Sequence, residues 1–150
     1  MPVLLTKRRG LPALDRRKLL RRAERLLREL DLSARELSIL LCGDEEIHGL
    51  NRAYRKKDRP TDVLSFSQQE GPDGHLHPEL LGDVVISLET ASREAGKGYV
   101  DLMDEVLDLL IHGVLHLLGQ DHEGVPTAQA KAMRREQARL NARVASAYEG

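Results

Sequence analysis

The chain has a single cysteine, Cys42, among its 150 residues, and it lacks any long apolar run. One cysteine excludes a framework of intrachain disulfides, so we expect a reducing, cytoplasmic setting. No apolar stretch approaches the roughly 20 residues that a membrane-spanning helix needs, and we expect no membrane partner. The basic residues Lys7, Arg8 and Arg9 are not followed by an apolar segment, so no secretory signal is predicted.

Aromatic residues are also scarce, since the chain has no tryptophan, three tyrosines and one phenylalanine. Proteins that bind single-stranded nucleic acids usually stack bases on aromatic rings, and this chain offers few such rings. A nucleic acid bound here would therefore be recognised mainly through its phosphates. Its affinity should then fall steeply as salt is added.

Charge is distributed unevenly along the chain, although the net charge is only −1. Residues 1–60 carry 16 Lys and Arg against 9 Asp and Glu, whereas residues 61–150 carry 7 against 15. Four arginines share one face of a predicted helix: Arg17, Arg21, Arg25 and Arg28. The pattern fits a basic surface that guides a polyanion, and it also fits an ordinary solvated helix face.

Hydrophobic periodicity predicts one α+β domain over residues 1–150. We expect strands at residues 3–5, 36–42, 61–67 and 83–88, and helices at residues 16–30, 44–54, 89–95, 100–118 and 126–147. Asp15 and Asp44 are suited to cap the first two helices. Residues 68–82 are rich in Gly and Pro and should form a long loop between two antiparallel strands.

Three histidines near residue 115 have the spacing of a metal site. His112 and His116 are four residues apart, so a helix places both imidazoles on one face, about 6 Å apart along its axis. Gly119 can end the helix in a left-handed conformation and return the chain so that His122 approaches the same point. Three nitrogen ligands leave one position open, as in catalytic zinc sites, although nickel, copper and iron also suit such ligands.

The helix that carries the first two histidines is apolar almost all round, so we expect it in the core. Its polar residues fall on one stripe, and burying such a stripe is costly unless its members are paired or bind a metal. Asp108, one turn before His112, is either a partner of that ligand's second nitrogen or an exposed carboxylate. The same two interpretations hold for Asp121 beside His122.

Gly113 occupies the position at which zinc proteases with this histidine spacing carry their general-base glutamate. A glycine cannot take a proton from the zinc-bound water or pass it to a leaving amine. The pattern therefore favours metal-assisted hydrolysis other than ordinary proteolysis. A phosphodiester suits such a site because a cation near the metal can stabilise its additional negative charge.

Three segments together resemble the YbeY family of metal-dependent endoribonucleases. They are the His-Gly-Val-Leu-His-Leu-Leu-Gly-Gln-Asp-His run at residues 112–122, residues 51–66 and residues 81–87. The resemblance implies a zincin-like α+β fold in which a small mixed sheet of about four strands packs with about five helices. It also implies one Zn²⁺ ion held by His112, His116 and His122.

The same resemblance implies a single-strand-specific endoribonuclease that acts in 16S rRNA 3′-end maturation and ribosome quality control. The implied partners are RNA, the small ribosomal subunit, and a ribosomal protein or an assembly GTPase. Arg55 matches the family's functional arginine, and with His116 it is the expected catalytic pair. Arg55 also lies in a basic cluster suited to phosphate contacts, or simply at a solvated helix end. Asp62 and Asp83 fall in the matching segments too, where each can equally cap or end a strand.

Two other functions remain open at this point. One is a zinc-dependent peptidase or other hydrolase that takes its base from elsewhere, such as Glu105 or Asp121. The other is a non-catalytic ribosome assembly factor in which the metal is structural and RNA is bound without being cut.

Overall fold

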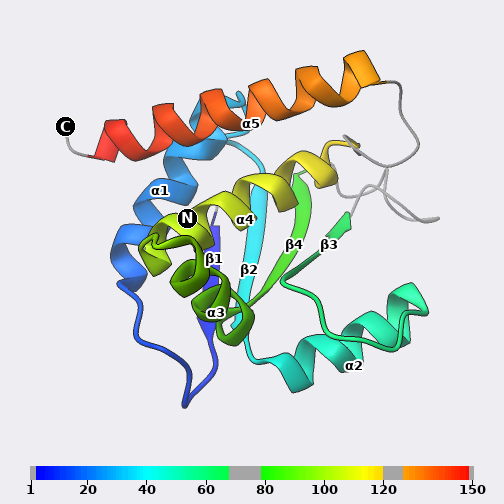
Figure 1. Ribbon diagram of the computed structural model, residues 1–150. Helices are drawn as coiled ribbons and strands as arrows, with labels where there is room; N and C mark the ends of the chain where they lie inside the picture. The colour runs from blue at the N-terminus through cyan, green and yellow to red at the C-terminus, as the bar shows by residue number, and fades with distance from the viewer. Residues whose placement is uncertain (1–2, 68–78, 120–126, 149–150) are drawn as a thin grey trace.

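The computed structural model (Figure 1) describes residues 3–67, 79–119 and 127–148, and this part of the chain forms four strands and five helices. The strands are β1 (Val3–Lys7), β2 (Glu36–Cys42), β3 (Val63–Ser67) and β4 (Leu80–Ser87). The helices are α1 (Arg16–Glu29), α2 (Asp44–Arg55), α3 (Leu88–Gly98), α4 (Leu102–Leu117) and α5 (Thr127–Tyr148).

The four strands form one mixed sheet in the order β1-β2-β4-β3. β1, β2 and β4 are parallel, and β3 is antiparallel to β4 at the edge of the sheet. The α+β class and the antiparallel pairing of the third and fourth strands are therefore confirmed. No helix in the described ranges is both long enough and apolar enough to span a membrane.

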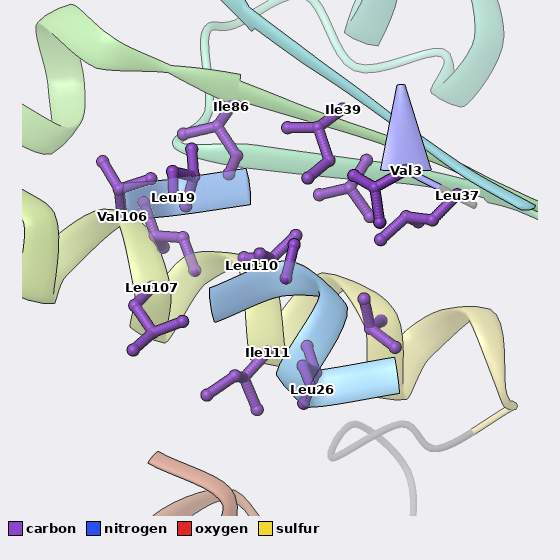
Figure 2. Close-up of a cluster of buried hydrophobic side chains, with 14 of the residues drawn as sticks. Val3, Leu19, Leu26, Leu37, Ile39, Ile86, Val106, Leu107, Leu110 and Ile111 are labelled. Carbon is purple, nitrogen blue, oxygen red and sulfur yellow. The ribbon is translucent and has the colours of Figure 1, made fainter. Parts of the chain in front are cut away.

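Side chains alternate between the two faces of the sheet, as the two-residue period of a strand requires. Leu37, Ile39 and Leu41 of β2 belong to the main core, together with residues of α1 and α4 (Figure 2). Leu40 and Cys42 point to the opposite face, where they pack with Ile47 of α2. The sheet thus lies between α2 on one side and a layer containing α1 and α4 on the other.

The last helix forms an outer layer over this core. α5 packs against both α1 and α4, and Figure 1 shows it running across their outer sides. Leu140 and Val144 of α5 are fully buried in the main core. Full burial of a leucine or valine side chain stabilises a fold by about 1.5–3 kcal/mol, so α5 is an integral part of the structure.

Two local expectations were wrong. Residues 80–82 belong to β4 and not to a loop, because they pair with β2, and Gly82 also pairs with Ser67 of β3. A Cβ atom on Gly82 would stand 2.5 Å from the carbonyl oxygen of Phe66. Glycine in that strand marks a close approach of two backbones. Asp44 is the first residue of α2 and not its cap, which is Gly43. The cap expected at Asp15 is confirmed, since its side chain accepts from the backbone N–H of Lys18 at 3.1 Å.

Candidate functional site

The two histidines of α4 converge on one point. The Nε2 atoms of His112 and His116 are 2.9 Å apart, and both side chains are partly buried. Two nitrogens bound to one tetrahedral zinc ion would be about 3.4 Å apart, given zinc–nitrogen distances of about 2.0–2.1 Å. Only a small rotation of the rings separates this arrangement from a shared ion, so the donor pair fits a zinc ion.

The end of α4 has the predicted geometry as well. Gly119 has a φ angle of +87°, and its N–H donates to the carbonyl oxygen of His116 at 2.9 Å. A left-handed glycine just after a helix redirects the chain. His122, the third expected ligand, and Asp121 lie outside the described residues. The structure therefore places two of the three expected ligands, both at the end of α4.

Arg55 is held at the edge of the sheet by two contacts. As the last residue of α2, it donates from its guanidinium to the carbonyl oxygen of Ser65 in β3. Its guanidinium carbon lies 5.0 Å from the centre of the Phe66 ring, within the range of a cation–π interaction. Tyr54 supports that ring with an edge contact, the centroids being 5.6 Å apart. The arginine is thus positioned by the edge strand and is not a loose helix end.

One cleft of about 550 Å³ brings these groups together. His112 and His116 form part of its wall, and the cationic side chains of Arg55, Lys57 and Arg59 form another part. No Asp or Glu is among the residues found to line it in the described part of the chain. The cleft is therefore electropositive, which favours an anion such as a phosphodiester.

The segment that carries Lys57 and Arg59 is fixed by α2. Asn51 is 2% exposed, and its side-chain Nδ2 donates to the backbone carbonyl oxygen of Arg59 at 2.8 Å. The backbone carbonyl oxygen of Asn51 accepts from the N–H of Lys57 at 3.3 Å. His48 Nε2 lies 2.7 Å from an Asp58 carboxylate oxygen. The sequence pattern predicted no role for Asn51 or His48. An asparagine one turn before a basic segment is the only signal that could have suggested one.

The acidic residues singled out in the sequence lie elsewhere. Asp83 lies in a second hollow with Tyr54 and Phe66, across the sheet from the histidines. Asp62 precedes β3, where its backbone carbonyl oxygen accepts from the N–H of Ser87 at 2.9 Å. Glu105 of α4 is not among the lining residues of the cleft either. Burial and then the nearby charges of Asp108 and Asp62 raise the pKa of Glu105.

None of the residues of the arginine face of α1 is among the described lining residues of the cleft. Arg22 is buried and lies 3.6 Å from an oxygen of Asp104, while Arg25 pairs with Glu29 at 3.0 Å. The Arg25 pair lies within α1, whereas the pair of Arg22, a neighbour outside the arginine face, joins α1 to α4.

Asp108 does not take the position of a direct partner of His112. Its carboxylate oxygen accepts from Gln137 Nε2 and from Asn141 Nδ2, each at 2.9 Å. Gln137 Oε1 is the atom that faces His112 Nδ1, at 3.4 Å. The sequence offered no signal for Gln137, because it lies on α5, 25 residues from the ligand.

Comparisons with known proteins agree with this geometry. A family model described as endoribonuclease YbeY matches residues 8–145. A curated endoribonuclease YbeY of Syntrophotalea carbinolica is 47% identical over 122 residues, which are 81% of each chain. That of Geobacter sulfurreducens is 42% identical over 133 residues, 89% of each chain. The solution structure of a Thermotoga maritima protein matches this one with a TM-score of 0.64 at 22% identity. The match covers 98% of this chain and 91% of that one, and it supports the fold.

Proposed function

Because this chain belongs to the YbeY family of endoribonucleases, we propose that it cleaves single-stranded RNA in the cleft between α4, β3 and residues 56–62. The cofactor we propose is one Zn²⁺ ion, held by His112, His116 and His122. The proposed role is 16S rRNA 3′-end maturation and ribosome quality control, carried out by residues 1–150 as one hydrolase domain.

One observation carries this proposal. The cleft combines two converging imidazole nitrogens with three cationic side chains, and none of its described lining residues is acidic. A peptidase needs a carboxylate near its metal to move a proton to the leaving amine. A phosphodiester has a better leaving group and gains more from nearby cations, since negative charge builds up on its oxygens.

Arg55 supplies a fixed positive charge for a non-bridging phosphate oxygen. Its contacts with Ser65 and Phe66 hold the guanidinium before substrate arrives, so little reorganisation is needed during the reaction. Lys57 and Arg59 bind flanking phosphates and orient the strand. When bound by the histidines, a zinc ion supplies Lewis-acid stabilisation of negative charge and an activated water.

The proposed partners follow from the same site. An rRNA strand is the substrate, and the small ribosomal subunit, with a ribosomal protein or an assembly GTPase, presents it in the cytoplasm. Support for RNA over other anions comes from the three cationic side chains that line the cleft, since a polyanion offers each of them a phosphate.

The test compares cleavage of a single-stranded RNA and of its duplex by the wild type, His116→Ala and Arg55→Ala. We expect each variant to lose about 100-fold or more in rate, and the duplex to be cut poorly. Arg52→Ala is the matched control, because Arg52 is exposed on the same helix and does not line the cleft. Elemental analysis should find one zinc per wild-type chain.

Unchanged cleavage by both active-site variants would exclude this function. Peptide turnover that a chelator abolishes would favour a peptidase instead. RNA binding without cleavage, in a protein that unfolds when its metal is removed, would favour an assembly factor with a structural metal.

A further inference from the structure

A chain of hydrogen bonds links α5 to the first proposed metal ligand. It runs from Asp108 of α4 to Gln137 of α5 and returns to His112 of α4. We propose that Gln137 is a positioning residue that fixes the tautomer of His112, so that the Nε2 of His112 carries the lone pair that a metal ion requires. The inference rests on the metal site proposed above and concerns no other part of that function.

The orientation of the Gln137 amide is determined by Asp108. Gln137 Nε2 lies 3.1 Å from the backbone carbonyl oxygen of Asp108 and 2.9 Å from its carboxylate. Both are acceptors only, so the donor end of the amide must face them. Its oxygen then points towards His112 Nδ1, at 3.4 Å.

This orientation determines which nitrogen of His112 carries the proton. A carbonyl oxygen accepts and cannot donate, so His112 Nδ1 must be the N–H that donates to Gln137 Oε1. A neutral imidazole has one N–H, and therefore the lone pair lies on His112 Nε2. That nitrogen is the one that faces His116 Nε2 at 2.9 Å. Metal-binding histidines commonly donate their second N–H to such a partner.

Asn141 strengthens the arrangement from one turn further along α5. Its Nδ2 donates to the carboxylate of Asp108 at 2.9 Å and to the carbonyl oxygen of Gln137 at 3.3 Å. Leu140 and Val144 anchor the same helix in the core. The position of Gln137 relative to α4 is therefore fixed by packing as well as by hydrogen bonds, which a positioning group requires.

The decisive variant is Gln137→Met, which keeps the length of the side chain and removes its three hydrogen bonds to Asp108 and His112. We expect its zinc affinity, measured by competition with a chromophoric chelator, to fall about 10- to 100-fold. Gln129→Met is the matched control, because Gln129 is an exposed glutamine of the same helix, and its affinity should not change. In the double variant Gln137→Glu with Asp108→Asn, the side chain at position 108 donates and the carboxylate at position 137 accepts. The side chain at position 137 still offers an acceptor oxygen to His112. The double variant should restore most of the affinity.

A second measurement needs no metal. Nitrogen chemical shifts of His112 in the zinc-free protein, taken at about pH 8.5 where an ordinary imidazole is neutral, report the tautomer directly. We expect the Nδ1–H form in the wild type and in the double variant, and a mixture of forms in Gln137→Met. An Nε2–H form in the wild type would overturn the inference, and so would a Gln137→Met affinity equal to that of the control.

The two proposals can fail separately. A wild-type chain that binds no zinc while His112 keeps the Nδ1–H tautomer would refute the metal site and leave the role of Gln137 in place. A chain that binds zinc equally well with and without Gln137 would refute the role of Gln137 and leave the metal site in place. Thermal unfolding of each zinc-free variant checks that the affinity change does not follow from a loss of folding.

Discussion

Ser65 of β3 donates its hydroxyl to the carbonyl oxygen of Gly113 in α4 at 2.9 Å, and the two residues are 48 positions apart. A Cβ atom on Gly113 would lie 2.8 Å from Cγ1 of Val84 and 3.1 Å from the Ser65 oxygen. The helix therefore packs directly on the sheet at this point. A glutamate at position 113, as in zinc proteases, would have no space between the two histidines of α4 and the sheet.

Gly113→Ala should lower the free energy of unfolding, although alanine is the better helix former. Val84 is fully buried and cannot move aside easily, so the added methyl group should cost about 1–3 kcal/mol of overpacking. This exceeds the gain of about 1 kcal/mol in helix propensity. Urea denaturation followed by circular dichroism measures the difference.

Gly49→Ala is the matched control for that experiment. Gly49 is inside α2, and a Cβ atom there would meet nothing within 4 Å. Its free energy of unfolding should rise by about 0.5–1 kcal/mol. If both substitutions stabilise the protein, the close packing of α4 on β4 is not the reason for glycine at position 113.

Lys57→Ala and Arg59→Ala should each weaken RNA binding and reduce its dependence on salt. Each lost phosphate contact should lower the slope of log affinity against log salt by about 0.7 for a single strand. Fluorescence anisotropy in a His116→Ala background, which should not cut the RNA, measures this slope. Arg17→Ala is the control, because Arg17 is exposed on α1 outside the cleft. An equal change with Arg17→Ala would place α1 on the RNA path.

Asp44→Asn should destabilise the protein by about 1–2 kcal/mol at pH 7. Burial of the Asp44 carboxylate opposes ionisation, but hydrogen bonds from Ser87, Thr90 and Arg93 outweigh it and lower its pKa. A carboxyl group with a lowered folded-state pKa stabilises the fold above its unfolded pKa of about 3.9, and this stabilisation is lost as the pH falls through the folded value. The difference from wild type should therefore begin to shrink below about pH 4 and disappear once the pH is below the lowered folded-state pKa. Glu45→Gln, an exposed change in the same helical turn, should have little effect at any pH.

Cys42 should be inert to thiol reagents in the folded protein. Burial raises the pKa of the Cys42 thiol to about 12, and the side chain is fully buried against Ile47. At about pH 8 the native protein should react more than 100-fold more slowly than an Ala132→Cys variant does at its exposed thiol. Addition of denaturant should release one reactive thiol per chain in the wild type. Rapid labelling of the native wild type would contradict the packing of β2 against α2.

Local sequence rules were sufficient for most of the fold. The spacing of apolar residues located every helix and strand that the structure describes, and Asp15 and Gly119 marked the ends of α1 and α4 correctly. They failed at Gly82 and Asp44, where a contact distant in sequence decides the outcome. Gly82 is in a strand because the Phe66 backbone approaches it, and Asp44 enters the helix because α3 supplies its hydrogen-bond partners.

The approach of His112 and His116 could be predicted from the sequence alone, because a separation of four residues on a helix sets their relation without any other part of the chain. The sequence also placed Arg55 in a basic segment, and the absence of a glutamate at position 113 argued against a protease. Which groups stand beside those histidines depends on the tertiary structure. Arg55 faces the same cleft because its guanidinium donates to the Ser65 carbonyl oxygen of β3, the edge strand of the described sheet, and Gln137 reaches His112 because α5 packs across α4. Such contacts depend on how the elements pack, and packing is a property of the whole chain that no local pattern contains.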